Sequence, residues 1–479
     1  MRIARTALAV TLAAFLAACS GAQIGRQISL PEVPSDRAEA NTPAAREHRR
    51  ILAAYGGSYN NPALEEQLNR SVEKLVAASE RPDMHYKVTI LNSPAVNAFA
   101  LPTGQLYVTR GLLALANDNS EVASVLSHEM AHVIARHAAI REDQIRQAAI
   151  LNRVASDVVG DPQMGALALA KSKIALATFS RGQEFEADGI GVGISSRAGY
   201  DPYGATRFLT SMGRSVELRS GSQKTDTRTL EFLSSHPATP ERVANATLNA
   251  RQYSAPGPGS REREEYVRLL DGLVYGEDPS EGFVRGRRFV HPKLGFTFTA
   301  PEGFVLENTP QAVFGIKDGG DQALRLDVVR IPADQKLTEY LQAGWIENID
   351  QNSVEEITIN GFRGATATAN GEAWGFRLYA IRFGSEVYRF IFAAKNKTPD
   401  LDRQFRETVA SFRRMSVAEA RAARPLRIKV VTVTARDTFD RLAARMAYAD
   451  KQMERFRVLN GLDANDKLKP GDIVKIVVE

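Results

Sequence analysis

The pentapeptide HEMAH, residues 128–132, constrains the local fold more than any other stretch of this 479-residue chain. Side chains four residues apart on an α-helix lie on one face, so His128 and His132 would point the same way with Glu129 beside them. This H-E-x-x-H pattern is typical of two imidazoles that bind zinc and a glutamate that acts as a general base. A solvated amphipathic helix is the alternative, because five-residue patterns also arise by chance. A further ligand elsewhere in the chain is needed to decide between the two.

The residues around HEMAH predict where its helix begins and which way it faces. Asp118 is a candidate N-cap with Glu121 three residues later, which is the arrangement of a capping box. His128 and His132 share a stripe with apolar residues, so both are expected to face inward. His137 lies nine residues after His128, about half a turn out of phase. We therefore expect His137 to face away from the site and to lie on the surface.

The third ligand is sought first among histidines and then among carboxylates. Alanine occupies both positions, 135 and 138, at which metzincins have a glycine and their third histidine, so that arrangement is excluded. The segment SRGQEFEADGIG supplies carboxylates instead: Glu184 and Asp188 are four residues apart and share a helix face, whereas Glu186 points elsewhere. One carboxylate can bind zinc while the other accepts the free N–H of a zinc-bound histidine. A solvated acidic helix face is the alternative, but it does not explain the pairing with HEMAH.

The first residues predict export. Arg2 and Arg5 precede the apolar run Ala7–Ala18, which is too short to span a bilayer as a mature helix. The run ends in LAAC, whose Cys19 is the only cysteine of the chain, and this resembles the lipobox of bacterial lipoproteins. The resemblance implies that Cys19 carries a lipid, and Ser20 after it favours the outer membrane. A plain secretory signal is the alternative. Because no later run of 18 apolar residues follows, we expect a soluble mature protein tethered by its N-terminus.

The chain is too long for one compact domain, and its texture changes several times. A net charge of +5 is small for this length and, without a nucleic-acid motif, predicts no nucleic-acid partner. We expect a multidomain protein with a mainly α-helical domain that contains a small β-sheet, an α+β domain and a small βααβ module. The expected boundaries are a signal peptide over 1–18, a tether over 19–45, the helical domain over 46–255, a linker with a short helix over 256–284, the α+β domain over 285–415, a linker over 416–425 and the last module over 426–479.

Four segments carry a family resemblance: NAFALPTGQLYVTRGLL, LSHEMAHVIARH, SRGQEFEAD and SSHPATPERV. They occur in the same order as in the zinc metallopeptidases that include the CAAX prenyl endopeptidase, HtpX and BepA. The resemblance covers residues 46–255 and is to the soluble periplasmic lipoprotein branch. It implies a gluzincin-type peptidase fold with one Zn²⁺ per chain. The C-terminal half differs from those relatives and leaves the choice of substrate open.

The resemblance also implies a role for each residue of the central motifs. His128, His132 and Glu184 bind zinc, and Asp188 orients a zinc-bound histidine. Glu129 is the general base that accepts a proton from the water attacking the peptide carbonyl, and it then donates a proton to the leaving amine. The chemistry agrees, because zinc with three protein ligands keeps a position open for that water and lowers its pKa to about 7.

Two later residues and an edge strand complete the expected site. His236 and Arg242 match the family's His-Pro…Arg motif. His236 is expected to donate to the oxyanion or to fill the fourth position on zinc in a resting enzyme, and Arg242 to position the substrate or its loop. A histidine at the start of a helix, without contact to metal, is the alternative. The expected substrate-binding strand, for which an ordinary sheet strand is the alternative, comprises Asn97, Ala98, Phe99 and Ala100.

The C-terminal half carries two further resemblances. The α+β domain resembles PsbP-like sandwiches through HPKLGFTF…APEGF. Residues 426–479 resemble a LysM module through ARDTFDRLAARM, LNGL and LKPGDIVKIV, and such modules bind N-acetylglucosamine polymers such as peptidoglycan. Arg436 replaces the glycine of that family's Gly-Asp-Thr turn. A module used for docking rather than for sugar binding is therefore the alternative.

Together these features predict a zinc-dependent endopeptidase of the bacterial cell envelope. We expect it to be lipid-anchored in the periplasm, at the outer membrane, and to cleave misfolded or stalled envelope proteins, with peptidoglycan as a further partner. The alternative from a different class is a non-catalytic adaptor that binds unfolded chains and peptidoglycan. An intact HEMAH motif together with Glu184 favours the enzyme.

Overall fold

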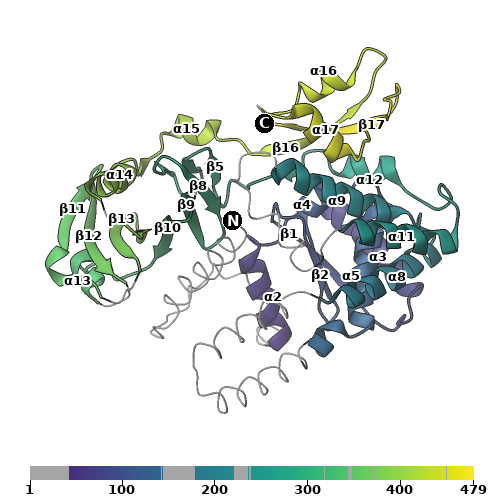
Figure 1. The fold of residues 1–479 in the computed structure, drawn as a ribbon, viewed down its shortest axis with the longest axis horizontal. Coiled ribbons are helices and arrows are strands. Elements are labelled where there is room, and N and C mark those ends of the chain that lie inside the picture. The colour runs from purple at the N-terminus through teal and green to yellow at the C-terminus, as the bar shows by residue number, and fades with distance from the viewer. Residues whose placement is uncertain are drawn as a thin grey trace. The chain divides into compact units, whose positions relative to one another are not determined.

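The chain divides into two compact units (Figure 1). One unit comprises Met1–Ala54 and Pro279–Arg424, and the other comprises Tyr55–Asp278 and Pro425–Glu479. The structure, a computed structural model, describes residues 42–141, 143, 179–220, 236, 239–317, 319–343, 348–371, 373–396, 398–448 and 450–479. The predicted signal sequence and Cys19 lie outside the described residues. Within them, no helix combines the length and the apolar character that a membrane span requires.

The unit that carries HEMAH contains a small sheet in the order β1-β3-β2. β1 (Lys87–Leu91) runs parallel to β3 (Gln105–Thr109), and β2 (Ala98–Ala100) pairs antiparallel with β3. A tight turn at Gly104 joins β2 to β3: its φ is +84°, and a Cβ there would lie 2.2 Å from the carbonyl oxygen of His85, so only glycine fits. Among the described strands β2 pairs with β3 alone, so its outer edge is open in the sense that no described strand pairs with it, although Ala98 is buried.

Helices surround this sheet, and the central one carries HEMAH. The helices of this unit are α3 (Pro62–Ala77), α4 (Arg110–Leu115), α5 (Asn119–Ile134), α8 (Arg181–Arg197), α9 (Gly204–Ser220), α11 (Pro240–Tyr253) and α12 (Arg263–Leu269). Every residue of α5 from Asn119 to His132 is buried, whereas a surface helix buries one face alone. The helices α3, α8 and α9 and the strand β2 pack against α5. The HEMAH motif therefore lies on a rigid, enclosed element.

The close packing of α8 on α5 depends on a glycine. At Gly191, an added Cβ would lie 2.9 Å from the backbone nitrogen of His128 and 3.0 Å from its Cα. Both distances are shorter than van der Waals contact, so a side chain at residue 191 would push the two helices apart. This approach brings the carboxylates of α8 within reach of the histidines of α5.

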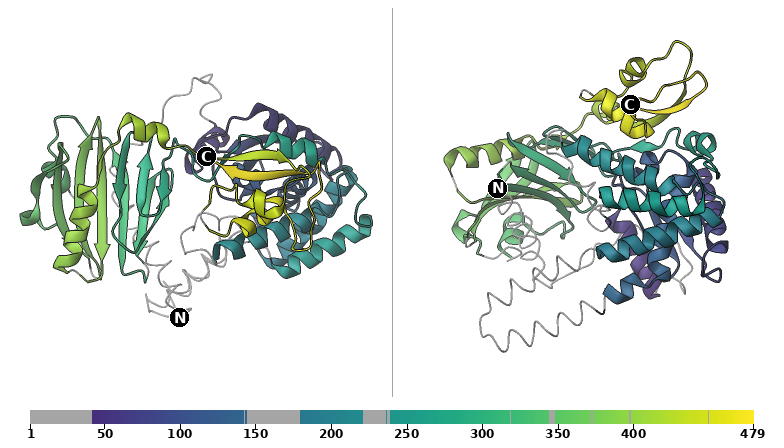
Figure 2. Two further views of the ribbon diagram at one scale, coloured as in Figure 1. Left: turned by 90° about the horizontal axis from the view of Figure 1, so that it is seen from above. Right: turned by 45° about the vertical axis from the view of Figure 1, so that its right-hand side comes forward.

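The C-terminal segment belongs to the same unit (Figure 2). It runs through β16 (Leu426–Thr432), α16 (Phe439–Ala443), α17 (Gln452–Asn460) and β17 (Ile473–Val478), in the strand–helix–helix–strand order expected from the sequence. β16 pairs with β17 on one edge and with β4 (Val274–Tyr275) on the other. Apolar side chains of this module share one continuous core with those of α3, α4 and α5. The LysM assignment itself stays a prediction.

The other unit has α+β architecture. Its larger sheet has the order β11-β12-β13-β14-β10-β9-β8 and its smaller sheet the order β15-β7-β6-β5. Alternate residues of β13 (Gly375–Phe383) serve two layers: Tyr379 and Ile381 join an aromatic core under α14 (Pro399–Ala410), whereas Leu378 and Ala380 pack with α13 (Leu337–Gln342).

The remaining elements of this unit are the other strands of the two sheets, two helices and a 3₁₀ turn. They are α2 (Pro43–Ala54), β5 (Phe283–Arg285), β6 (Arg288–His291), β7 (Phe296–Thr299), β8 (Phe304–Asn308), β9 (Ala312–Lys317), β10 (Gln322–Val329), a 3₁₀ turn (Gln351–Ser353), β11 (Glu355–Ile359), β12 (Phe362–Asn370), β14 (Glu386–Ala394), β15 (Arg413–Arg414) and α15 (Val417–Ala422). Neighbouring strands in both sheets pair antiparallel where their register is defined.

Candidate metal centre

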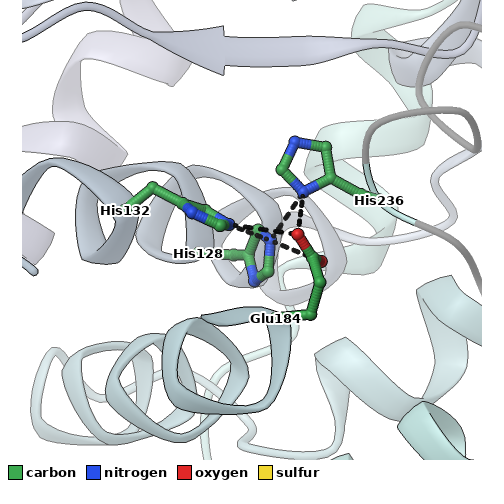
Figure 3. Close-up of side chains that lie close together, drawn as sticks. All are labelled: His128, His132, Glu184 and His236. Carbon is green, nitrogen blue, oxygen red and sulfur yellow. Dashed lines mark hydrogen bonds and ion pairs between the residues drawn. The ribbon is translucent and has the colours of Figure 1, made fainter. Parts of the chain in front are cut away.

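Four buried side chains converge on one point (Figure 3). His128 and His132 come from α5, Glu184 from the first turn of α8, and His236 from the segment before α11. The Nε2 atoms of His128 and His132 are 3.1 Å apart. Nδ1 of His236 lies 3.3 Å from Nε2 of His128 and 2.9 Å from Oε1 of Glu184. The Glu184 carboxylate lies 3.6 Å from Nε2 of each α5 histidine. The structure thus brings the three predicted ligands together and adds His236 to them.

The shorter of these separations are close to those of a tetrahedral metal site, and all four ligand atoms lie within 4.8 Å of one another. Ligand atoms about 2.0–2.1 Å from a zinc ion are roughly 3.3 Å from one another at tetrahedral angles. Burial lowers the pKa of His128 and of His132, and it lowers that of His236 to about 3. All three imidazoles are therefore neutral and have a lone pair for a metal. Imidazoles with one carboxylate are also the donor set that suits zinc.

Glu129 lies beside this group and is buried. Its Oε1 is 3.9 Å from Nε2 of His236 and, within the described residues, has no hydrogen-bond partner. Burial and the charge of Glu184 raise the pKa of Glu129 well above its usual range, although Arg242 and the backbone N–H of Ala100 oppose the rise. A carboxylate with a raised pKa is a better proton acceptor than an ordinary one. This environment suits the role predicted for Glu129.

Asp188 and Arg242 hold the ligands in place. Oδ1 of Asp188 is 3.0 Å from Nδ1 of His128, although the N–H is not aligned for a hydrogen bond in this structure. A small rotation of the ring would make that bond and leave Nε2 free for a metal. Arg242 donates to Asp188 at 2.8 and 2.6 Å and contacts Glu184 at 2.8 Å. Burial alone would raise the pKa of Asp188, but hydrogen bonds from Arg242 and the proximity of His128 lower it to about 2. The expected contact of Arg242 with substrate stays a prediction; in this structure its guanidinium holds two carboxylates.

The surface position expected for His137 is wrong. Its side chain is 1% exposed, and its Nδ1 lies 2.9 Å from Nδ1 of His132. The expectation extended the helical phase past the end of the helix. α5 ends at Ile134, and Arg136 adopts a left-handed φ of 56° that turns the chain back toward the site. Glu186 does not join the four ligands; it contacts Nε2 of His137 at 3.3 Å.

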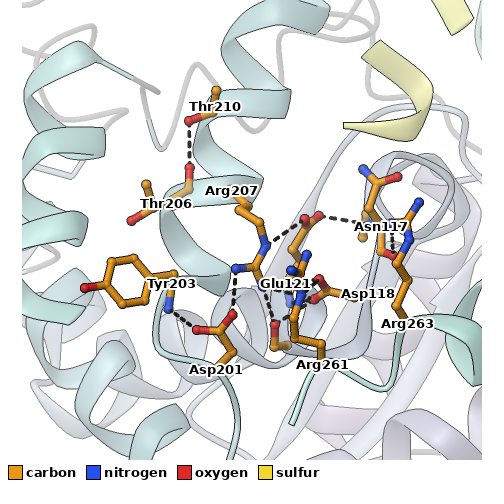
Figure 4. Close-up of polar contacts among 12 residues, drawn as sticks. Asn117, Asp118, Glu121, Asp201, Tyr203, Thr206, Arg207, Thr210, Arg261 and Arg263 are labelled. Atoms are coloured by element: carbon orange, nitrogen blue, oxygen red, sulfur yellow. Dashed lines mark hydrogen bonds and ion pairs between the residues drawn. The ribbon is translucent and has the colours of Figure 1, made fainter. Parts of the chain in front are cut away.

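A buried charge cluster fixes the amino end of α5 (Figure 4). The predicted N-cap is confirmed, because the Asp118 side chain accepts the N–H of Glu121. The Glu121 carboxylate accepts the N–H of Asn117 at 2.9 Å. Arg207 of α9 lies 3.2 Å from the Asp118 carboxylate and 3.6 Å from that of Glu121. Burial and the charge of Asp118 raise the pKa of Glu121 to about 7. These contacts hold the helix that carries HEMAH against α9.

The predicted substrate strand coincides with β2, which packs against α5. The carbonyl of Asn97 and the N–H of Leu101 bond to β3. In an antiparallel pair the alternate residues face the other way, so Ala98 and Ala100 direct their backbone groups to the open edge. The N–H of Ala100 reaches the Glu129 carboxylate. The open edge therefore lies beside the candidate base.

The side chains of this segment pack against aromatic neighbours. The ring of Phe99 stacks on that of Tyr107, with centroids 4.9 Å apart. Nδ2 of Asn97 donates to the hydroxyl of Tyr55 at 3.0 Å. Substrate contact through this strand would therefore be made by its backbone.

Some contributors to the site carry little or no sequence signal. The spacing of glycines in DGIGVG, which includes Gly191, is the available sign of close helix packing. The reversal at Arg136 that buries His137 has no such sign, because arginine rarely adopts a positive φ. Phe179 stacks on the ring of His132 with centroids 4.1 Å apart, and an isolated phenylalanine in a sequence predicts only burial.

The site contains two histidines of an H-E-x-x-H helix, a glutamate from a second helix and a buried carboxylate beside them. This combination defines a site of the zinc-metallopeptidase class. Comparison with known families agrees with this class. Residues 62–250 match the family described as Peptidase family M48. The family predicted from the four sequence segments is thereby confirmed for the domain that carries them.

Curated relatives share this domain. The beta-barrel assembly-enhancing proteases of Yersinia pestis and Escherichia coli are 28% and 30% identical to it over 228 and 202 residues, which cover 46% and 40% of this chain and 45% and 40% of theirs. The mitochondrial metalloendopeptidase OMA1 of Schizosaccharomyces pombe is 29% identical over 203 residues, 41% of this chain and 56% of its own. The chain thus spans about half the length of the curated relatives it matches.

A solved structure matches the chain weakly. Cyanobacterial PsbP (CyanoP) from Synechocystis sp. PCC 6803 has a TM-score of 0.23 and 15% identity, covering 28% of this chain and 98% of that chain. A TM-score of this size assigns no fold, so the PsbP-like character of residues 285–415 stays a prediction.

Proposed function

We propose that this chain is a zinc-dependent endopeptidase of the bacterial cell envelope that cleaves misfolded or stalled envelope proteins. The observation that carries the proposal is the cage formed by His128, His132 and Glu184, with the buried Glu129 beside it. The names of the bacterial relatives, which refer to beta-barrel assembly, support the setting in the envelope.

When bound, zinc supplies Lewis acidity that polarises a carbonyl and acidifies a water molecule to a pKa of about 7. The residues of the chain do the rest. Glu129 accepts the proton of the attacking water and passes a proton to the leaving nitrogen. The N–H of Ala100 holds the Glu129 carboxylate in place between these two transfers. The Asp188 carboxylate, 3.0 Å from Nδ1 of His128, favours a proton on that nitrogen, which leaves Nε2 for the metal.

The open edge of β2 is the proposed binding site for substrate. An extended peptide that pairs with the backbone groups of Ala98 and with the carbonyl of Ala100 would pass next to Glu129, which the N–H of Ala100 contacts. Main-chain pairing does not depend on the side chains of the peptide. The enzyme should therefore have little sequence preference and should require a locally unfolded segment in its substrate. Both properties suit an enzyme that removes misfolded proteins.

His236 is proposed to serve in two states. Its Nδ1 lies 3.3 Å from Nε2 of His128, where a fourth ligand would complete the tetrahedron, and this supports a resting state closed by His236. When substrate displaces it, the same ring can donate a hydrogen bond to the oxyanion, which requires the protonated nitrogen to face the carbonyl oxygen. Burial lowers its pKa to about 3, so the ring is neutral and can act in both ways.

We further propose that Cys19 carries a lipid that anchors the chain to the outer membrane from the periplasmic side. For the C-terminal module, the docking role is supported better than peptidoglycan binding. Phe456, Val474 and Ile476 lie in the core that the module shares with the peptidase helices. The first role of the C-terminal module is therefore to complete the fold of this unit.

Metal analysis combined with a proteolysis assay tests the proposal. The purified chain should contain one zinc per molecule and digest casein, and a chelator should abolish the digestion. Glu184→Ala should lose zinc, whereas the exposed Glu66→Gln on α3 should retain it and remain active. A wild-type chain that binds unfolded casein without zinc and without cleavage would favour the adaptor instead.

A further inference from the structure

The outward nitrogen of His132 meets another histidine rather than a carboxylate. Nδ1 of His132 lies 2.9 Å from Nδ1 of His137. Nε2 of His137 lies 3.3 Å from Oε2 of Glu186. The side chain of His137 is 1% exposed and that of Glu186 is 58% exposed. The three groups therefore form a continuous path from the ligand point to solvent.

The positions of the protons along this path follow from which nitrogen faces the ligand point. Nε2 of His132 is the atom 3.1 Å from Nε2 of His128, so it must be free of a proton to bind a metal. The proton of His132 then lies on Nδ1 and can be donated to Nδ1 of His137. His137 in turn carries its proton on Nε2 and donates it to Glu186. Each N–H in the path has one acceptor, and each acceptor has one N–H.

The two histidines of HEMAH thus differ in their partners. His128 has a direct carboxylate, Asp188, at 3.0 Å. Buried histidines that bind metals nearly always donate their second N–H to such a group, because this fixes the tautomer and the ring orientation. We propose that His137 is the positioning residue for His132 and that Glu186 fixes the tautomer of His137. This inference rests on the proposed function, in which His132 binds zinc.

The local backbone and an aromatic ring are arranged for this role. The left-handed Arg136 folds the chain back directly after α5, which places His137 against the edge of the His132 ring. Phe179 covers the face of the same ring, with centroids 4.1 Å apart and an interplanar angle of 29°. The ring of His132 is held at its edge by a hydrogen bond and at its face by stacking. Filling of space alone would not require two nitrogens at hydrogen-bond distance.

Zinc affinity, measured by competition with a chromogenic chelator, tests the proposal without reference to activity. His137→Leu leaves the N–H of His132 without an acceptor and should weaken zinc binding by about 10- to 100-fold. His137→Asn offers an amide oxygen near the former Nδ1 and should restore most of that loss. In the cobalt-substituted protein, the d–d absorption should change in His137→Leu and remain close to wild type in His137→Asn. A purely space-filling role predicts the reverse, because leucine fills the volume better than asparagine.

A pair of exposed carboxylates extends the test to variants that fold normally. Glu186→Gln removes the charge at the end of the path and should weaken zinc binding by less than about 10-fold. Glu241→Gln is the matched control. The side chain of Glu241 is 59% exposed and pairs with Arg181 at the start of α8, and this variant should bind zinc as the wild type does.

Wild-type zinc affinity and cobalt spectra in both His137→Leu and Glu186→Gln would overturn the inference. If His137→Leu does not fold, equal affinities of the Glu186 and Glu241 variants would overturn it. A wild-type chain that binds no zinc would overturn the proposed function, and this inference with it.

Discussion

The chemistry of the ligand group depends on which atoms accept and carry protons, and Glu129 is the proposed acceptor. Glu129→Gln keeps the size of the side chain and can still accept the N–H of Ala100, but an amide cannot take a proton from water. We expect turnover of casein to fall by about 10²- to 10⁴-fold while the zinc content stays at one per chain. Glu265→Gln, an exposed carboxylate of α12, serves as the control and should be unchanged. Retention of wild-type turnover by a zinc-loaded Glu129→Gln would refute the assignment of the base.

The two roles of His236 predict opposite changes in the same variant. If His236 acts mainly on the oxyanion, His236→Ala should lower kcat by about 10²-fold with little change in KM. If it acts mainly as a resting-state ligand, the variant should digest unfolded casein faster and lose some zinc affinity. His291→Ala removes an equally buried histidine from the other unit and shows the effect of losing a histidine as such. A variant that matches the wild type in rate, zinc affinity and autolysis would eliminate both roles.

One lysine of β17 bridges two elements of the unit that holds the site. The side chain of Lys475 is 0% exposed, and its Nζ donates to the carbonyls of Ala114 and Ala116 at 2.7 Å each. These carbonyls belong to the carboxyl end of α4, which has no further turn to satisfy them. Burial and the nearby Arg263 lower the pKa of Lys475 well below its usual range. The hydrogen bonds of the lysine satisfy the last carbonyls of α4.

Lys475→Met tests this bridge between β17 and α4, because methionine has a similar length and no hydrogen-bond donor. Two buried carbonyls would lose their partner, which should destabilise this unit by about 1–3 kcal/mol. Both tryptophans of the chain lie between residues 279 and 424, so tryptophan fluorescence in urea follows the other unit and should not shift. Hydrogen exchange of peptides from α4 and β17 should accelerate. The exposed Lys429→Met on β16 is the control. Equal hydrogen exchange in the two variants would contradict the bridging role of Lys475.

Individual elements could be predicted better than their partners. The sequence predicted the helix of HEMAH with Asp118 as its cap, because capping and the four-residue spacing are local. It did not predict that Lys475 would reach Ala114, more than 350 positions away in the chain. Periodicity shows that a face is buried but not which element covers it. For the same reason the approach of α8 at Gly191 and the pairing of β4 with β16 became known only from the structure.

At the scale of the whole molecule, the peptidase unit is discontinuous in sequence. The chain leaves it after Asp278 and returns at Pro425. The two crossing points lie next to paired strands, because Tyr275 of β4 is opposite Leu426 of β16. A short connection could therefore join them as a hairpin. By this criterion the segment 279–424, which forms the other unit together with Met1–Ala54, interrupts the peptidase unit, whereas 425–479 is part of the unit that is interrupted.

Two deletions should consequently have opposite outcomes. Removal of 425–479 takes Phe456, Val474 and Ile476 out of the shared core, and these three side chains alone contribute about 5–9 kcal/mol, comparable to the whole stability of a typical domain. We expect that truncated chain to be insoluble or to be digested during expression. Replacement of 279–424 by a short Gly/Ser linker removes more residues and leaves that core intact.

The excised variant should therefore remain soluble, bind one zinc and digest casein at close to the wild-type rate. Zinc content, casein digestion and hydrogen exchange of α5 peptides measure the outcome, and Glu129→Gln in the same background shows that the activity belongs to this site. Near-normal exchange in α5 after truncation at 424 would contradict the shared core. Loss of zinc after excision of 279–424 would show that this segment is required to hold His128, His132 and Glu184 together.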